Sequence, residues 1–466
     1  MELIALLSIA ILLAAILFFK NIFGGLILAC TLCTLGYMLH NENSLFIPIA
    51  NSFLIFFELV LLLSGALFFY NVLQQRDHFS FIDHLKERGM DHYSLLMMLS
   101  FFLISFFEGI AGFGIPAMLI APKLMRCGYS SVSAVVLSLC GGFVAVLFGA
   151  LGTPIKMGFD ITQPCIAVYK ILWLNMIGIL SIPLLLYFLS KYTSPHVKMH
   201  FKWRSVLAAG FCFLVPFSVG VFLSPEWPSV LAGSLGLWLY IRFFTKSPLR
   251  FSVRFWWRAF RPYIVFLLFL ILYRYFCSDM FLLEHNEFKK ISAFQPGFLF
   301  WITGSFFSID KAHKYDWYMA FSATFKKLAK PLLTLLLLIY FSQVVREEVK
   351  YLFSSIIMEK SMYFADMMSF LSGIAGAFLT GSATMSNILF TSLKEMTFWS
   401  MAMLHSGSVL GNIVSLQNII MVNSVTEHAT PLHRILRFHT PVLMIYSLLI
   451  FFSYVYMNLF YHLLNK

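Results

Sequence analysis

The sequence predicts an all-α polytopic membrane protein with about 12 transmembrane helices and two re-entrant hairpins, arranged as an inverted repeat. The composition is 60% hydrophobic and 12% charged, with a mean hydropathy of +0.83, which is typical of a polytopic membrane protein. Apolar segments of spanning length follow one another along the chain. Two hydrophobic stretches are interrupted by glycine and polar residues at corresponding places in the two halves, as in many secondary transporters.

Segments of about 17 to 25 apolar residues are long enough to cross a bilayer as helices. In the first half they are Leu3–Phe19, Ile22–Leu39, Phe46–Leu73, Val132–Leu151 and Cys165–Leu189. Two joining helices follow at Ser205–Leu223 and Trp227–Phe244. The second half contains Pro262–Phe276, Gln295–Ile309, Leu328–Val345, Phe398–Val422 and Phe438–Leu459. The polar connections between them are too short to fold a soluble core.

The interrupted stretches, His92–Met125 and Ser361–Lys394, are each about 34 residues long, which suits two short helices better than one span. Each contains Gly-Ile-Ala-Gly, at Gly109–Gly112 and again 264 positions later at Gly373–Gly376. Gly and Pro release backbone groups that lipid cannot satisfy. We therefore expect each stretch to form a re-entrant hairpin with the glycine-rich segment at its tip.

The same offset predicts the domain plan. It places the spans that begin at Leu3, Ile22 and Phe46 roughly onto those that begin at Pro262, Gln295 and Leu328. The first predicted domain is an inverted repeat over residues 1–190 with its hairpin at 92–125. A joining region over 191–261 follows, with two helices and a basic interfacial segment. The last domain is a second inverted repeat over 262–466 with its hairpin at 361–394. The span after each hairpin has a predicted weak point, at Leu139–Gly142 and at His405–Asn412.

The net charge of +12 is typical of a membrane protein with one fixed orientation, because cytoplasmic loops are enriched in Lys and Arg. With both hairpins treated as non-crossing, most Lys and Arg residues fall on one side, which we assign to the cytoplasm. The chain is therefore predicted to cross a membrane several times, with the lipid bilayer as a partner and no nucleic acid.

The hairpin tips offer what a small organic anion needs. Helix N-termini present free N–H groups and a positive dipole end, and glycine allows a close approach of the backbone. Hydroxyl and amide groups of the second half can form hydrogen bonds with a substrate hydroxyl group that lies beside a carboxylate. The candidate substrate-binding residues are Gly109, Gly112, Gly114, Thr380, Gly381, Ser382, Thr384, Ser386, Asn387, Ser406, Gln417 and Asn418. The alternative is that these small residues only permit tight helix packing.

Glu108 is the candidate for proton coupling. It stands next to the first predicted tip, and a buried carboxyl group can be neutral at one stage of a transport cycle and charged at another. Glu58, Asp366 and Lys170 are further ionisable residues in apolar sequence, for which a structural ion pair is as good an interpretation as a role in transport. His405 is interpreted as a hydrogen-bonding wall or a titrating group.

Four motifs make the chain resemble the bacterial L-lactate permease family. They are Phe107–Pro116 and Phe148–Ile155 in the first half, and Thr380–Asn387 and Gly411–Ile419 in the second. The resemblance implies a fold like that of the ion-transporter superfamily, and proton-coupled symport of lactate or a similar 2-hydroxymonocarboxylate such as glycolate.

The chain departs from the family pattern at three positions in the second half. The family usually has Asp at Ala383, Lys at Asn412 and Pro at Leu416. Loss of an acid and a base from one region keeps the charge balance of a binding site while changing what it binds, so the departures put the substrate and the coupling ion in question.

Other function classes stay open at this point. One alternative is a carrier that couples another organic anion to Na⁺ instead of H⁺, and another is a membrane sensor or scaffold that transports nothing. A membrane enzyme is not expected, because no nucleophile and base pair and no metal-ligand cluster has suitable spacing. The sequence indicates no cofactor and does not specify an oligomeric state.

Overall fold

The computed structural model describes residues 2–17, 22–40, 45–75, 90–110, 112, 114–159, 161, 164–244, 253–277, 281–283, 291–292, 295–308, 315–357, 362–391, 396–426, 428 and 430–464. The chain divides into two compact units. Unit 1 comprises Met1–Arg88 and Leu249–Val349, and unit 2 comprises Gly89–Pro248 and Lys350–Lys466. Each unit therefore combines segments from both halves of the sequence, and each is described by itself. The boundaries of the predicted repeats stay a prediction.

Unit 1 is built mainly from helices. They are α1 (Glu2–Leu17), α2 (Ile22–His40), α3 (Phe46–Gln75), α13 (Val253–Cys277), α14 (Pro296–Ser308) and α15 (Tyr315–Ile357), with a short antiparallel ribbon of β1 (Phe281–Leu283) and β2 (Ile291–Ser292). Helices α3 and α14 pack closely, and Phe69, Phe266 and Phe300 fill the space between them and α13. The predicted interfacial segment and the span after it form one helix, α13, although Arg250 and the side chains of Arg254 and Arg258 lie outside the described residues.

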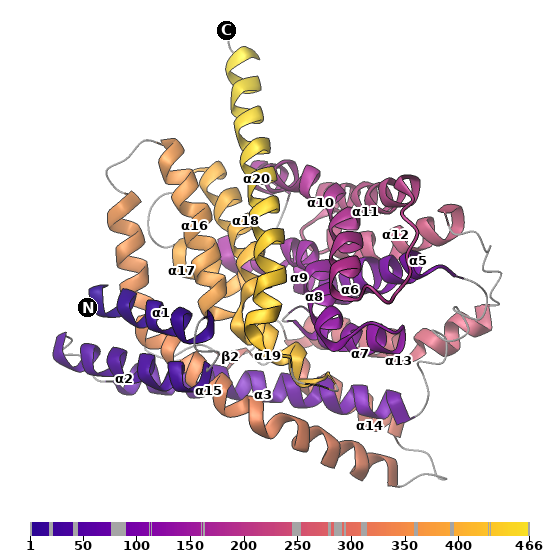
Figure 1. Cartoon of the computed structure of the whole chain (residues 1–466), viewed down its shortest axis with the longest axis horizontal. Coiled ribbons are helices and arrows are strands. Elements are labelled where there is room, and N and C mark those ends of the chain that lie inside the picture. The colour runs from indigo at the N-terminus through magenta and orange to yellow at the C-terminus, as the bar shows by residue number, and fades with distance from the viewer. Residues whose placement is uncertain are drawn as a thin grey trace. The chain divides into compact units, whose positions relative to one another are not determined.

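Unit 2 contains two series of helices in the same order, which we call the first and the second repeat of unit 2 (Figure 1). That they belong to the longer inverted repeats predicted over 1–190 and 262–466 stays a prediction. The first repeat consists of α5 (His92–Met97), the π-helical η1 (Met98–Leu103), α6 (Ile104–Ile110), α7 (Ile115–Arg126), α8 (Ser131–Gly142), the 3₁₀ segment η2 (Phe143–Phe148), α9 (Gly149–Phe159) and α10 (Ile166–Thr193). The second repeat consists of α16 (Met362–Thr380), α17 (Ala383–Thr391), α18 (Phe398–Val414), α19 (Leu416–Ser424) and α20 (Leu432–Leu464). The joining helices α11 (Trp203–Leu223) and α12 (Pro228–Phe244) complete the unit.

The two repeats share N-caps and packing glycines at corresponding positions, as well as the order of their elements. Helix α8 begins at the N-cap Ser130, whose side chain accepts a hydrogen bond from the Ser133 N–H, and α18 begins at Thr397, which accepts in the same way from Ser400. A glycine also brings each of these helices onto the backbone of the long hairpin arm. A Cβ atom at Gly141 would lie 1.6 Å from the Ser100 carbonyl oxygen, and one at Gly407 would lie 2.0 Å from that of Phe370.

The repeats also pack against each other reciprocally. Helix α7 of the first repeat contacts α19 of the second, and α17 of the second contacts α9 of the first. In the same way α10 packs on α18, and α20 packs on α8. Reciprocal contacts of this kind are what an approximate twofold axis between two related elements produces.

Apart from single end residues, the predicted spans are helical over their described residues, with two exceptions: the break that begins at residue 149, and Ser415. Among those residues, six helices are long and apolar enough to cross a membrane: His92–Ile110, Ser131–Lys156, Ile166–Thr193, Trp203–Leu223, Met362–Thr380 and Leu432–Leu459. Shorter apolar helices lie within 23–39, 46–58, 297–308 and 332–345. The chain therefore has the character of a polytopic membrane protein, while the number of about 12 spans stays a prediction.

Two details of the prediction are wrong. The second Gly-Ile-Ala-Gly lies inside α16 instead of at a tip, because the chain turns later, at Gly381, where φ is +69°. The predicted weak points at Leu139–Gly142 and His405–Asn412 are helical, and their glycines serve close packing. The actual breaks come later, at residues 149–152 and at Ser415.

Candidate functional site

A narrow, partly enclosed cavity lies within unit 2 where the chain breaks of both repeats meet. The first hairpin tip contributes Gly112, and the second contributes the N-terminal end of α17. The broken helix of the first repeat forms another wall, and α18 adds a residue from just before its own break. The residues that line the cavity are Glu108, Gly112, Val146, Gly149, Ala150, Pro154, Gly381, Ser382, Ala383, Thr384 and Asn412. Of these described residues, Glu108 alone is ionisable.

The broken helix of the first repeat has an unusual backbone. Gly149 is extended, and the next residues Ala150, Leu151 and Gly152 have φ values of +45°, +56° and +75°. Left-handed backbone costs a non-glycine residue roughly 1 kcal/mol, so surrounding contacts have to hold it. The Thr153 hydroxyl donates to the Ala150 carbonyl, and Lys156 forms an ion pair with Glu226 in the turn between α11 and α12.

Side chains of the second repeat form hydrogen bonds with carbonyl groups on both sides of this break. Asn387 Nδ2 donates to the Pro154 carbonyl oxygen over 3.0 Å and lies 2.9 Å from His405 Nδ1. His405 Nε2 lies 2.8 Å from the Leu147 carbonyl oxygen. Since a carbonyl can only accept, Nε2 carries the ring proton and Nδ1 accepts from Asn387. His405 is therefore a neutral, fully buried imidazole.

The second hairpin tip presents the start of a helix to the cavity. The Thr380 hydroxyl donates to the carbonyl oxygens of Gly376 and Ser382 and so fixes the turn at Gly381. Ser382 Oγ accepts from the Met385 N–H, and α17 begins at Ala383. The N–H groups of Ala383 and Thr384, ahead of the one that Ser382 occupies, have no partner within the helix and form a site that suits an anion.

Asn418 joins the tips of both hairpins. Its Nδ2 atom lies 3.2 Å from the Gly381 carbonyl oxygen and also donates to the Asn412 side chain. A Cβ atom at Gly114, where φ is +74°, would lie 3.1 Å from Asn418 Oδ1. Gln417 is buried and packs against Gly381. Gly114, Gln417 and Asn418 thus shape the cavity without lining it.

Four of the predicted binding residues, Gly112, Gly381, Ser382 and Thr384, line the cavity, as does Glu108. Gly114, Thr380, Gln417 and Asn418 lie behind that wall. Three others have a packing role. Gly109 faces Val230 of α12. Ser386 donates to the Gly373 carbonyl and accepts from Ser408, and Ser406 accepts from Asn175.

The other ionisable candidates belong to separate clusters. Glu58 of unit 1 accepts a hydrogen bond from Gln295 over 2.9 Å. Asp366 is fully buried in unit 2, where it accepts hydrogen bonds from Ser400 and from Tyr454. The Lys170 ammonium lies 4.2 Å from the centre of the Trp399 ring. Asp366 therefore joins α16, α18 and α20 at the far end from the α18 break.

The prediction did not include Val146, Gly149, Ala150 and Pro154 as candidate site residues. The signal for a break was present, because glycines at 149 and 152 and the proline at 154 bracket it. The glycine pair at Gly141–Gly142 also suggested a break in the helix. In the structure Gly141 instead allows close packing against Ser100. Asn412 and Ala383 were singled out as departures from the family, and both line the cavity.

The fold and the site define a polytopic helical membrane protein in which two hairpins and two broken helices meet at a buried polar cavity. A family model described as L-lactate permease matches residues 2–254 and 284–461. The chain therefore belongs to the L-lactate permease family.

Individual relatives are distant. The chain is 30% identical to the putative L-lactate permease of Haemophilus influenzae over 152 residues, which are 31% of this chain and 28% of that protein. It is 26% identical to the L-lactate permease of Streptococcus iniae over 220 residues, which are 46% of this chain and 45% of that protein. The matched regions thus span less than half of these relatives. No solved structure matches the chain.

Proposed function

We propose that the chain is a secondary transporter that carries lactate or a similar small 2-hydroxymonocarboxylate across the bacterial inner membrane together with a proton. The observation that carries this proposal is the convergence of both hairpin tips and a broken helix on one buried cavity that contains Glu108. Broken helices at a repeat interface are the usual substrate site of secondary transporters. The family membership and the names of the relatives support the same substrate class.

The charges of the cavity favour proton coupling. Its described lining contains one carboxyl group and no cationic side chain. A substrate carboxylate at the N-terminus of α17 and an ionised Glu108 would repel each other in a site that contains little water. A proton on Glu108 removes this repulsion and provides a hydrogen-bond donor. Binding of the anion and binding of the proton therefore favour each other, which is the coupling that a symporter needs.

In this mechanism the two hairpins enter the membrane and return on the same side, in opposite senses in the two repeats. The shared element order and the reciprocal packing of the repeats in unit 2 support this arrangement. Ser382 and Thr384 offer hydroxyl groups to the substrate hydroxyl, and the N–H groups of α17 hold its carboxylate.

Uptake of radiolabelled L-lactate into proteoliposomes that contain the purified protein tests the proposal. An inward proton gradient should drive accumulation above the external concentration, and an uncoupler should abolish it. Protein that is folded but takes up no lactate under either condition would contradict the proposal.

A second candidate function is the transport of a different small anion, with Na⁺ as a further candidate for the coupling ion. Ala383 and Asn412, where the family usually has Asp and Lys, both line the cavity, so the departures fall at the proposed binding site. Competition of the labelled lactate uptake by a panel of small carboxylates, each measured with a proton gradient and with a sodium gradient, separates the two candidates.

A further inference from the structure

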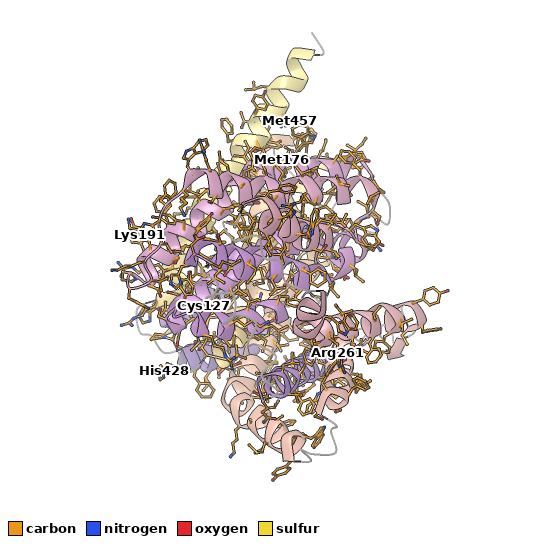
Figure 2. All side chains as sticks on the ribbon, turned by 90° about the vertical axis from the view of Figure 1, so that its right-hand side faces the viewer. Cys127, Met176, Lys191, Arg261, His428 and Met457 are labelled. Atoms are coloured by element: carbon orange, nitrogen blue, oxygen red, sulfur yellow. The ribbon has the colours of Figure 1, made fainter. Side chains whose placement is uncertain are left out.

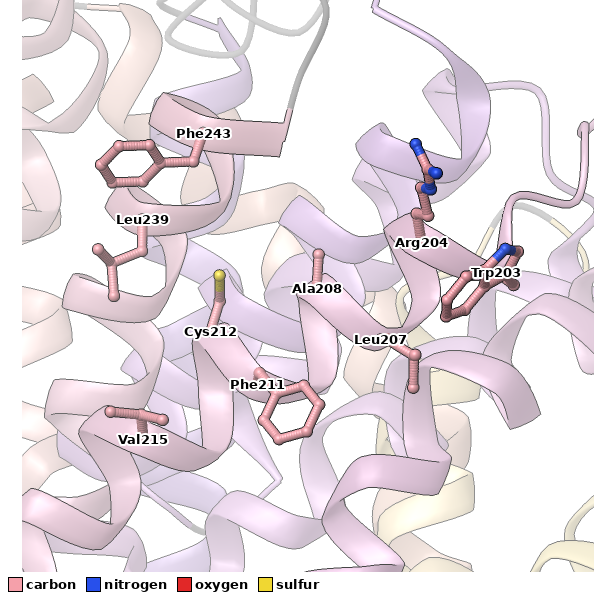
Figure 3. A pocket seen from close by; sticks show the side chains of 9 residues that line it. All are labelled: Trp203, Arg204, Leu207, Ala208, Phe211, Cys212, Val215, Leu239 and Phe243. Atoms are coloured by element: carbon pink, nitrogen blue, oxygen red, sulfur yellow. The ribbon is translucent and has the colours of Figure 1, made fainter.

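A second recess of unit 2 lies on its outer face, between α11 and α12. One side is formed by α11 residues from Trp203 to Val215, and the other side by Leu239 and Phe243 of α12 (Figure 3). The lining residues are Trp203, Arg204, Leu207, Ala208, Phe211, Cys212, Val215, Leu239 and Phe243. We call this recess the α11–α12 groove. Its walls are apolar apart from Arg204.

The groove lies on a helix face whose exposed side chains are apolar. Leu207, Phe211 and Val215 follow one another at four-residue spacing along α11, and their side chains are 41%, 52% and 55% exposed. Large apolar side chains this exposed, in a row on a spanning helix, indicate a surface that faces lipid tails.

Positive charge is gathered at one end of the groove. Arg204 is exposed and forms no ion pair with any residue that the structure describes. The Arg242 guanidinium lies 5.6 Å from the centre of the Phe243 ring, at the same end. Exposed lysines lie at the C-terminal end of α10, from which Lys191 projects (Figure 2), and in the loop between α10 and α11. These lysines are Lys191, Lys198 and Lys202.

The length of the groove matches one leaflet. From Arg204 to Val215 the helix advances 11 residues, or about 16 Å at 1.5 Å per residue. Half of a hydrocarbon core of about 30 Å is about 15 Å. Arg204 therefore lies at the depth of the phosphate groups when Val215 lies near the middle of the bilayer. Trp203 stands beside Arg204, as aromatic residues do at the membrane interface.

We propose that the α11–α12 groove binds one anionic phospholipid. Its acyl chain lies along Leu207, Phe211 and Val215, and its phosphate group pairs with Arg204. A cationic end joined to an apolar groove one leaflet deep matches the two parts of such a lipid. The exposed row of α11 continues past the groove to Val219 and Phe222, but a packed helix from another copy would leave Arg204 without an anion. The sequence assigns this end to the cytoplasmic side, where anionic lipids attract basic segments.

Native mass spectrometry of the purified full-length protein tests the proposal. Phosphatidylglycerol and phosphatidylcholine with identical acyl chains are added in equal amounts, and the bound lipid is counted. We expect the wild type to prefer phosphatidylglycerol, and Arg204→Gln to reduce that preference about fivefold, which corresponds to about 1 kcal/mol. The matched control is Arg437→Gln, which removes an exposed arginine of α20 outside the groove, and it should keep the preference.

The outcomes are distinct. Equal binding of the two lipids by the wild type would overturn the proposal, as would an unchanged preference in Arg204→Gln. A dimer that persists without lipid and that Phe211→Trp disrupts would assign the groove to a second copy instead. Lipid binding does not depend on transport, so failure of this test leaves the proposed transport function unaffected.

Discussion

The two repeats of unit 2 have the same element order but bring different chemistry to the cavity. The first repeat contributes Glu108 and a backbone break in which Ala150 and Leu151 are left-handed. The second repeat contributes the hydroxyl groups of Ser382 and Thr384 and a regular helix N-terminus. One repeat thus holds the titratable group, and the other holds the donors for an anion. In the proposed mechanism, proton binding therefore falls to the first repeat and substrate binding to the second.

The strongest test of this division is Glu108→Gln. Because glutamine cannot release a proton, gradient-driven uptake should fall to the level of protein-free liposomes, while counterflow exchange of the labelled anion without a gradient should persist. Asp91→Asn, which changes an exposed acid at the start of α5, is the control and should leave uptake within about twofold of the wild type. Normal proton-driven accumulation in Glu108→Gln would show that the first repeat does not carry the coupling site.

The next test adds charge to the second repeat. Ala383→Asp places a second carboxyl group in a cavity whose described lining already contains Glu108, and an unpaired buried charge costs about 3–5 kcal/mol. We expect the rate of uptake to fall more than tenfold, and Ala383→Asp combined with Asn412→Lys to recover much of it. A double-mutant cycle on the uptake rate measures the coupling, which should exceed about 1 kcal/mol. Purely additive effects would mean that the two positions do not form a charge pair.

Asn387→Ala tests how the second repeat supports the first. It leaves the Pro154 carbonyl and His405 Nδ1 without their donor, so we expect the free energy of unfolding to fall by about 2–4 kcal/mol. The thermal unfolding of the purified protein measures this loss. Asn458→Ala removes a single hydrogen bond to the Tyr454 carbonyl on α20 and should cost less than half as much. Equal losses in the two variants would argue against a bracing role of Asn387.

The smallest effects separate Ser382, which precedes α17, from Ser386, which lies within α17. Ser382 lines the cavity, so Ser382→Ala should weaken substrate binding about fivefold, which corresponds to about 1 kcal/mol. Ser386 faces α16 and α18, so Ser386→Ala should lower stability by about 1 kcal/mol and leave affinity unchanged. Isothermal titration with the substrate and thermal unfolding measure the two quantities. An affinity loss confined to Ser386→Ala would reverse the assignment of the faces.

Much of the fold followed from hydrophobic length, because each predicted span is an apolar run that is helical over most of its described residues. The positions of the breaks did not follow in the same way. Glycine has two uses that look identical in sequence. Gly141 and Gly407 let two helices touch, whereas Gly381 supplies a left-handed turn. Only the three-dimensional neighbours decide between the two uses.

The same limit applies to the candidate site. Glu108 and Ser382 were predicted from their chemistry and their position near a tip, and both line the cavity. Asn387 was predicted to bind substrate, but its amide nitrogen is occupied by Pro154 and His405. The partners of Asn387 depend on contacts between the repeats, for which one sequence carries no direct signal. Ala150 was missed because alanine has no chemistry that marks a binding site.

The hydrogen bonds between Asn387 and Pro154 and between His405 and Leu147 have a consequence for the order of biosynthesis. The paired residues are 233 and 258 positions apart. At about 5–20 residues per second, roughly 12–50 s pass between the synthesis of the broken helix and the arrival of the side chains that close it. During that interval the carbonyl groups of Leu147 and Pro154 lack these donors. The hydrogen bonds that complete the first repeat therefore form only after α17 and the first half of α18 have been translated.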